Sequence, residues 1–115
     1  MEGVPVTVVE VESFPAKAAE VWSDAERLEF ISYLASNPET GDLIPGGGGV
    51  RKVRWSRAGM GKRGGVRVIY YYHDESMSVF LLTVYPKSRQ ENLSSAELKM
   101  IRQVVLILRR SYGKD

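Results

Sequence analysis

Two strand-like runs in the second half of the chain limit its fold more than any other feature. Residues 65–73 (GVRVIYYYH) and 78–85 (SVFLLTVY) are rich in β-branched and aromatic side chains, which favour strands. Only residues 74–77 separate the two runs, so the pattern predicts a β-hairpin. Strands joined by so short a connection pair antiparallel. The chain therefore contains an antiparallel sheet.

Short sequence signals place three helices around this hairpin. Pro15 suits the first turn of a helix, where its missing N–H group has no partner to lose. Ser23 with Glu26, and Ser94 with Glu97, form capping-box patterns, and apolar residues recur at helical spacing after each. We therefore predict helices over residues 15–22, 24–36 and from about 95 to 110.

The other segments read as strands and loops. Four consecutive glycines make residues 41–49 typical of a loop, and residues 57–64 are a short, basic connection whose tip we expect to be exposed. Alternating, valine-containing patterns predict strands over residues 4–11 and 50–56.

Alternation along these strands gathers basic side chains on one face. Lys52 and Arg54 share a face of the strand after the glycine loop, while apolar residues take the other. In the next strand Arg67 and Tyr71 share a face, opposite Tyr70.

The predicted order is strand, helix, helix, three strands, helix. A helical pair followed by adjacent antiparallel strands favours an α+β fold, with the helices packed on one face of a small sheet. A chain of 115 residues, 43% of them hydrophobic, can build one core, so we predict a single domain over residues 1–115.

The net charge of +2 conceals a strong internal asymmetry. Residues 1–50 hold 2 basic and 9 acidic residues, a balance of −7, whereas residues 51–115 hold 14 basic and 5 acidic residues, a balance of +9. The interval between Asp42 and Asp74 contains no acidic residue and seven basic ones. A stretch of this kind attracts a polyanion.

Several functional classes are disfavoured by what the chain lacks. It has no cysteine and one histidine, His73, so neither thiolate nor histidine metal sites are expected, and we predict no cofactor. The lysine of GGGGVRK lacks the neighbours of a phosphate-binding P-loop. The chain begins without a signal-peptide pattern, and its longest apolar run, residues 104–108, is too short to cross a bilayer. We expect a soluble cytoplasmic protein that has no contact with membranes.

The basic stretch is interleaved with aromatic residues, which suits nucleic-acid binding. Arginine and lysine on a strand face can hold several phosphates, and tyrosines can stack on bases. A plainer interpretation is that the charges keep the strand soluble while the three tyrosines at positions 70–72 pack the core.

Three motifs together carry a family resemblance. GGVRKVRW, GKRGGVRVIYYY and LLTVYPKSRQENLSSAE resemble the HigB-type toxins of the RelE superfamily, the toxic halves of bacterial toxin–antitoxin pairs. The resemblance covers nearly the whole chain, and the predicted order of elements agrees with it.

The resemblance implies an endoribonuclease that enters the ribosomal A site and cuts mRNA there. Such enzymes are metal-independent: the ribose 2′-hydroxyl attacks the adjacent phosphate. The implied partners are the ribosome, mRNA, and a cognate antitoxin whose helix-turn-helix domain contacts operator DNA.

Residue by residue, the resemblance assigns Lys52 and Arg54 to basic strand positions that touch the reacting phosphate. Arg67 matches the arginine after the glycine turn, and Lys87 matches a basic residue beyond the last strand. Arginine suits charge stabilisation because it stays protonated, and for that reason it is a poor base. A lysine crowded by other cations could have a lowered pKa and exchange protons.

The proton carrier is open, because this chain has Glu91-Asn92-Leu93 where RelE has a tyrosine. The candidates are Tyr71, Tyr85, Lys87 and Glu91. Three further basic residues, in the exposed connection, suit contacts with ribosomal RNA: Arg57, Lys62 and Arg63.

Two other functions remain open. A ParE-like inhibitor of DNA gyrase would have a similar fold and a protein target, although it has no need of a cationic phosphate site. A nucleic-acid-binding module without catalysis would use the same basic stretch.

Overall fold

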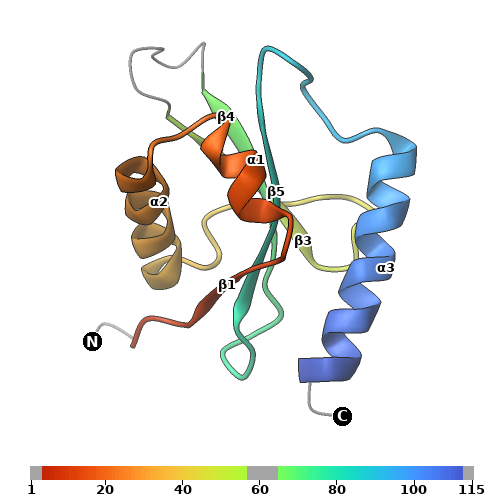
Figure 1. Cartoon of the computed structure of the whole chain (residues 1–115). Helices are drawn as coiled ribbons and strands as arrows, with labels where there is room; N and C mark the ends of the chain where they lie inside the picture. Colours follow the sequence, from red (N-terminus) through yellow and green to blue (C-terminus); the bar gives the residue numbers. More distant parts are fainter. Residues whose placement is uncertain (1–3, 57–64, 113–115) are drawn as a thin grey trace.

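The computed structural model describes residues 4–56 and 65–112, which form one five-stranded sheet and three helices (Figure 1). The strands are β1 (Val8–Glu10), β2 (Asp42–Leu43), β3 (Val50–Trp55), β4 (Val66–Tyr71) and β5 (Val79–Pro86). The helices are α1 (Phe14–Ala19), α2 (Asp24–Ser36) and α3 (Ser95–Tyr112).

The sheet has the order β1-β5-β4-β3-β2. The central hairpin pairs β4 with β5 antiparallel, as predicted, and β3 pairs antiparallel with β4. Only β1 lies parallel to its neighbour, β5. The hairpin is thus the centre of the sheet, and all six residues of β4 are buried.

One residue of β5 interrupts its pairing with β4. Ile69 pairs with Thr83 and Tyr70 pairs with Leu81, so Leu82 lies between two paired positions without a partner of its own. An extra residue of this kind is a β-bulge, and it reverses the alternation of the side chains that follow. After Leu82, each side chain of β5 therefore points to the face of the sheet opposite to the one it would take in an uninterrupted strand.

The first face of the sheet is covered by α1 and α2. Phe14 and Ala18 of α1 and Phe30 and Leu34 of α2 belong to one buried cluster with the inward side chains of β3, β4 and β5. An aromatic row joins α2 to β3, because the Phe30 ring lies 5.3 Å from that of Trp22 and 5.1 Å from that of Trp55.

The opposite face is covered by α3, so the expectation that all helices share one face is wrong. A second buried cluster joins Ile69, Tyr71 and Phe80 of the sheet to Val105 of α3. The long segment after β5 gives α3 room to cross to the other side of the sheet, where it buries apolar residues that α1 and α2 cannot reach (Figure 1).

The start of each helix agrees closely with the sequence signals, although α1 ends at Ala19, three residues before the predicted end. α2 spans the predicted residues 24–36, and both capping boxes form: Ser23 and Glu26 exchange hydrogen bonds of 2.8 and 3.1 Å, as do Ser94 and Glu97. The first strand is shorter than predicted, at Val8–Glu10.

One strand was not predicted. β2 lies within the segment expected to be loop, and its two residues pair with Lys52 and Arg51 of β3. Its position is fixed from outside, since the Tyr70 hydroxyl donates a hydrogen bond to the Pro38 carbonyl and accepts one from the Gly41 amide, each 2.8 Å long. So short an edge strand leaves no periodic pattern to detect.

Candidate active site on the sheet

Three predicted site residues lie in one row across the sheet, on the face covered by α3. Arg54 of β3 pairs with Arg67 of β4, and Arg67 pairs with Tyr85 of β5. Directly opposed residues of neighbouring strands point to the same side, about 5 Å apart at Cβ. Tyr85 belongs to this row because of the bulge at Leu82, which turns it to the face of Arg67.

Arg67 is the only charged side chain among the fully buried residues that the structure describes. It is 2% exposed, and its Nη2 donates to Glu91 Oε2 at 3.0 Å. Its Nε has no hydrogen-bond partner among the described residues, although it is buried. A buried guanidinium with an unused N–H donor has the capacity to bind an anion.

Glu91 neutralises this arginine from the segment that joins β5 to α3. The Arg67 guanidinium, by hydrogen bond and by charge, lowers the pKa of the Glu91 carboxyl, with smaller contributions from Lys87 and Arg54. The same effect shows that Lys87 and Arg54 lie near the carboxylate. Three of the predicted cations, Arg67, Arg54 and Lys87, therefore act on one carboxylate.

Tyr85 is buried beside this charged cluster. Burial raises the pKa of its hydroxyl, and the charge of Arg67 opposes that rise. The hydroxyl points to the backbone carbonyl of Glu91, at 3.5 Å. Tyr85 is consequently protonated at neutral pH.

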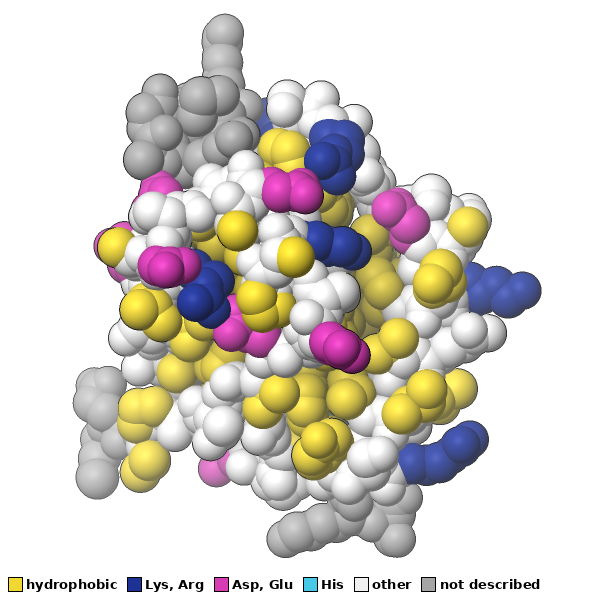
Figure 2. Space-filling model, in the orientation of Figure 1, with side chains coloured by type: hydrophobic (Ala, Val, Ile, Leu, Met, Phe, Trp, Pro, Cys, Tyr) yellow, Lys and Arg dark blue, Asp and Glu magenta, His cyan; other side chains and the backbone are white. Residues whose placement is uncertain are grey.

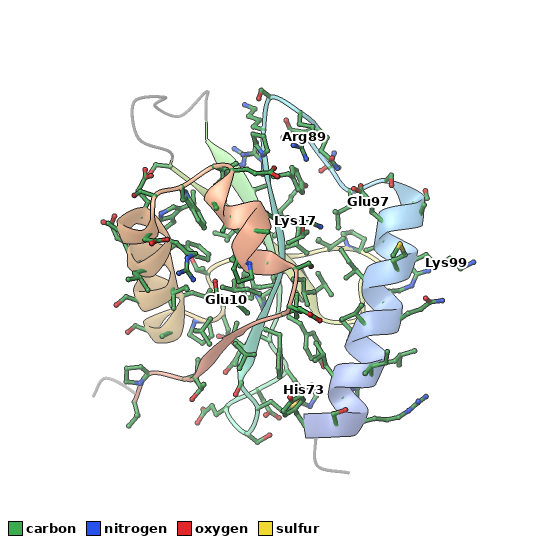
Figure 3. All side chains as sticks on the ribbon, viewed as in Figure 1. Glu10, Lys17, His73, Arg89, Glu97 and Lys99 are labelled. Carbon is green, nitrogen blue, oxygen red and sulfur yellow. The ribbon has the colours of Figure 1, made fainter. Side chains whose placement is uncertain are left out.

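Lys52 borders the cluster and fixes the next residue of the segment after β5. Its Nζ donates to Asn92 Oδ1 at 2.6 Å. Gln90 holds the segment from within, because its amide donates to the Asn92 carbonyl and to Glu97 Oε1, each at 3.0 Å. Figure 3 shows Arg89 on this segment and Glu97 in the first turn of α3, where the segment ends.

A cavity of about 610 Å³ opens beside the cluster. Its polar wall includes Lys52, Arg54 and Asn92, and its apolar wall includes Leu93 and Leu98. A concave site with an apolar wall and a few polar groups suits a flat, partly apolar ligand such as a nucleobase.

The structure does not bring Tyr71 into this group. Tyr71 lies four residues beyond Arg67 on β4, about 13 Å away at the rise of a strand. Its ring packs against Gly49, and the charged residues that affect its pKa are Arg109 and Asp74 rather than the site cations. Tyr71 is a core residue, as the plainer interpretation of the tyrosines expects.

The predicted RNA-contacting residues Arg57, Lys62 and Arg63 lie outside the described residues. His73 follows β4 and is 3.5 Å from the Asp74 carboxylate, at the far end of the strand from Arg67. It has no part in the cluster.

Sequence reasoning missed the direct contacts made by the segment after β5. Glu91 was a candidate proton carrier, but its ion pair with Arg67 was not foreseen, nor was the hydrogen bond between Lys52 and Asn92. A signal existed: a lone acidic residue, Glu91, follows four basic or polar residues directly after the last strand.

The described part of the chain lacks two features. No described helix is long and apolar enough to span a membrane. Residues 4–56 and 65–112 contain no group of three or more His, Cys, Asp or Glu side chains placed to hold a metal ion.

The architecture is that of a small α+β protein with a basic row on its sheet, the class to which the RelE-like toxins belong. A comparison with protein families makes this definite. The family described as the RelE toxin of the RelE / RelB toxin-antitoxin system matches residues 15–112, which include every helix except the first residue of α1 and every strand except β1. The chain therefore belongs to the RelE toxin family. The resemblance to the HigB-type subclass stays a prediction.

Proposed function

We propose that this toxin is a ribosome-dependent endoribonuclease that cleaves mRNA in the A site without a metal ion. One observation supports this most: Arg67, buried and with an unused Nε donor, lies in a row with Arg54 and Tyr85 and beside Lys87. RelE family membership supplies the toxin class, and the basic row supplies a place for a phosphate.

In the proposed reaction, Arg67 binds the scissile phosphate through its planar fork. The ribose 2′-oxygen forms a bond to phosphorus while the bond to the 5′-oxygen of the next nucleotide breaks. The products are a 2′,3′-cyclic phosphate and a free 5′-hydroxyl. Arg67 and Arg54 stabilise the extra negative charge of the phosphorane, which a buried, fixed arginine does well because it needs no reorganisation.

Two protons move in this reaction, one from the 2′-hydroxyl and one to the leaving 5′-oxygen. Tyr85 suits the second step, because its raised pKa keeps it protonated beside Arg67. Glu91 and Lys87 are the titratable side chains near Arg67 that could accept the first proton. Tyr71 is too distant from Arg67 to serve either step.

The cavity beside Lys52 and Arg54 gives the neighbouring nucleotide a place to bind. A phosphate on the basic row would bring one base to the apolar wall formed by Leu93 and Leu98. The ribosome would present the codon to this surface. The cognate antitoxin, which we propose carries a helix-turn-helix domain, would prevent that encounter.

Primer-extension mapping of mRNA ends after induced expression in bacteria tests the proposal. The native chain should leave mRNAs cut within codons, and Arg67→Ala should leave them intact. Arg110→Ala is the matched control, since it removes one exposed arginine from α3, away from the basic row.

Each of the other outcomes has a definite meaning. Intact mRNA with reduced DNA supercoiling would favour the gyrase inhibitor. Intact mRNA and unchanged supercoiling, with RNA bound by the purified protein, would favour a binding module without catalysis. Cleavage that survives Arg67→Ala would remove Arg67 from the active site.

A further inference from the structure

The anion-binding group of the proposed site is already occupied in the free protein. Glu91 Oε2 lies 3.0 Å from Arg67 Nη2, the distance at which a charge-assisted hydrogen bond to a phosphate oxygen would form. The two partners differ greatly in burial, since Arg67 is 2% exposed and Glu91 is 53% exposed. The arginine is fixed in place, and the carboxylate approaches it from the solvent side.

Only the side chain of Glu91 has to move to free the arginine. The Glu91 backbone carbonyl faces the Tyr85 hydroxyl, and the next residue, Asn92, is held by Lys52. An exposed side chain on a fixed backbone can change rotamer without unfolding its segment. A phosphate arriving from solvent would come by the same path as the carboxylate.

The burial of Arg67 explains why an internal anion is useful. An unpaired guanidinium out of water is costly, so the free protein needs a counter-charge at this point. Glu91 supplies one negative charge among Arg67, Arg54 and Lys87. A phosphodiester also carries one negative charge, so exchanging one for the other keeps the charge balance of the site.

We infer that Glu91 is an internal substitute for the substrate phosphate: it positions Arg67 in the free toxin and competes with the RNA backbone for it. The inference rests on the proposed function, because it takes Arg67 as the phosphate-binding residue. RNA must displace the Glu91 carboxylate in order to bind. The exchange is a cost to binding that the ribosome-bound substrate must overcome.

The charge of Glu91 should make this competition depend on pH. The charged and titratable groups that act on the carboxylate or on its neighbour Tyr85 come from every surrounding element. They are Arg67 of β4, Arg54 of β3, Tyr85 of β5, Lys87 just after β5 and Glu97 of α3. Glu91 is the carboxylate in contact with Arg67, so its charge is the one lost in acid, and the raised pKa of Tyr85 keeps that hydroxyl neutral there. Protonation of Glu91 weakens its hold on Arg67, so phosphate binding should strengthen as pH falls.

The test is the dissociation constant of a uridine trinucleotide blocked by 2′-O-methyl groups, measured by NMR titration of the free protein. The ligand cannot be cleaved. Glu91→Gln should bind it roughly two- to fivefold more tightly than the native chain, the effect expected from losing an ion pair whose carboxylate is half exposed to solvent. Glu20→Gln is the matched control, because Glu20 forms an exposed ion pair with Arg89 instead of Arg67.

A pH series of the native chain is a second measurement, and its result does not depend on whether a variant folds. Because Arg67 holds the pKa of Glu91 below its usual value, native affinity should stay level near neutral pH and rise as pH falls below the ordinary carboxylate pKa of about 4.3. Glu91→Gln should show a flat profile over the same range. A merely structural role of Glu91 would produce neither the tighter binding nor the difference between the two profiles.

The outcomes separate this inference from the function on which it rests. If Glu91→Gln binds no more tightly than Glu20→Gln, or the native profile is flat, the competition does not exist. If Arg67→Ala binds the trinucleotide as tightly as the native chain, the phosphate site is elsewhere and the proposed function loses its central residue. Loss of binding in Arg67→Ala together with an unchanged Glu91→Gln would overturn the inference alone.

Discussion

The two faces of the sheet are built differently. Under α1 and α2, four buried side chains of the helices meet the strands, and aromatic rings join α2 to β3. Under α3, only Val105 of an 18-residue helix is buried, while Met100, Leu106 and Ile107 are more than half exposed. Figure 2 shows hydrophobic side chains on the outer surface of the molecule on the side of α3.

The charged groups follow the same division. Arg67, its ion pair with Glu91 and the neighbouring cations lie on the face of α3. The buried cluster under α1 and α2 holds no charged residue, and the ion pair on that side, between Arg27 of α2 and Glu10 of β1, is partly exposed. The face under α1 and α2 thus mainly stabilises the fold, while the face under α3 carries the buried charge. We therefore expect stability and activity to respond to different substitutions.

The largest expected effect is on stability, at the first face. Phe30→Ala should lower the free energy of unfolding by about 3–5 kcal/mol, because it leaves a cavity between Trp22 and Trp55. Val105→Ala, on the second face, should cost about 2 kcal/mol. Urea denaturation monitored by fluorescence measures both. Equal costs would contradict the division between the faces.

The next effect is on activity, within the basic row. Arg67→Ala should lower kcat/KM for cleavage of ribosome-bound mRNA by about 10²–10³, the loss typical of a fixed charge-stabilising donor. Arg54→Ala should lower it by only about tenfold, because Arg54 is exposed and a mobile charge holds the phosphate less well. Similar losses from both variants would mean that the burial of Arg67 has no role in the chemistry.

Much of this molecule could be predicted because the signals are local. Each capping box lies within four residues, so Ser23 and Glu26 place the start of α2 wherever the helix packs. The shared face of Lys52 and Arg54, and that of Arg67 and Tyr71, follow from the period of a strand alone.

The rest depends on contacts distant in the sequence. The sequence around Leu82 does not indicate the bulge that turns Tyr85 toward Arg67, since the bulge arises from pairing with β4. The Arg67 to Glu91 ion pair spans 24 residues and forms only when the segment after β5 folds back over the sheet. The side taken by α3 depends on the same segment.

A smaller effect distinguishes the two capped helices. Ser23→Ala and Ser94→Ala each remove one N-cap, which costs about 1 kcal/mol. Because α2 is packed into the core, Ser23→Ala should lower global stability. α3 buries only Val105 fully, with Ile101 and Leu108 partly buried against the sheet, so Ser94→Ala should instead speed amide hydrogen exchange within α3. Uniformly faster exchange throughout the chain in Ser94→Ala would show that α3 unfolds only together with the sheet.

The smallest expected effect is the pH dependence of stability at Glu91. Because Arg67 lowers the pKa of Glu91 in the folded protein, the ion pair stabilises the fold above the unfolded pKa of about 4.3. That stabilisation is lost as pH falls through the lower, folded pKa. The native chain should therefore melt at a higher temperature than Glu91→Gln at neutral pH, and the two melting temperatures should converge in acid.

Glu97→Gln is a useful comparison, since the Ser94 amide lowers the pKa of Glu97 by a hydrogen bond that has nothing to do with the basic row. If Glu97→Gln also converges with the native chain while Glu91→Gln stays parallel to it at every pH, the charged face owes its order to the α3 cap and not to the ion pair.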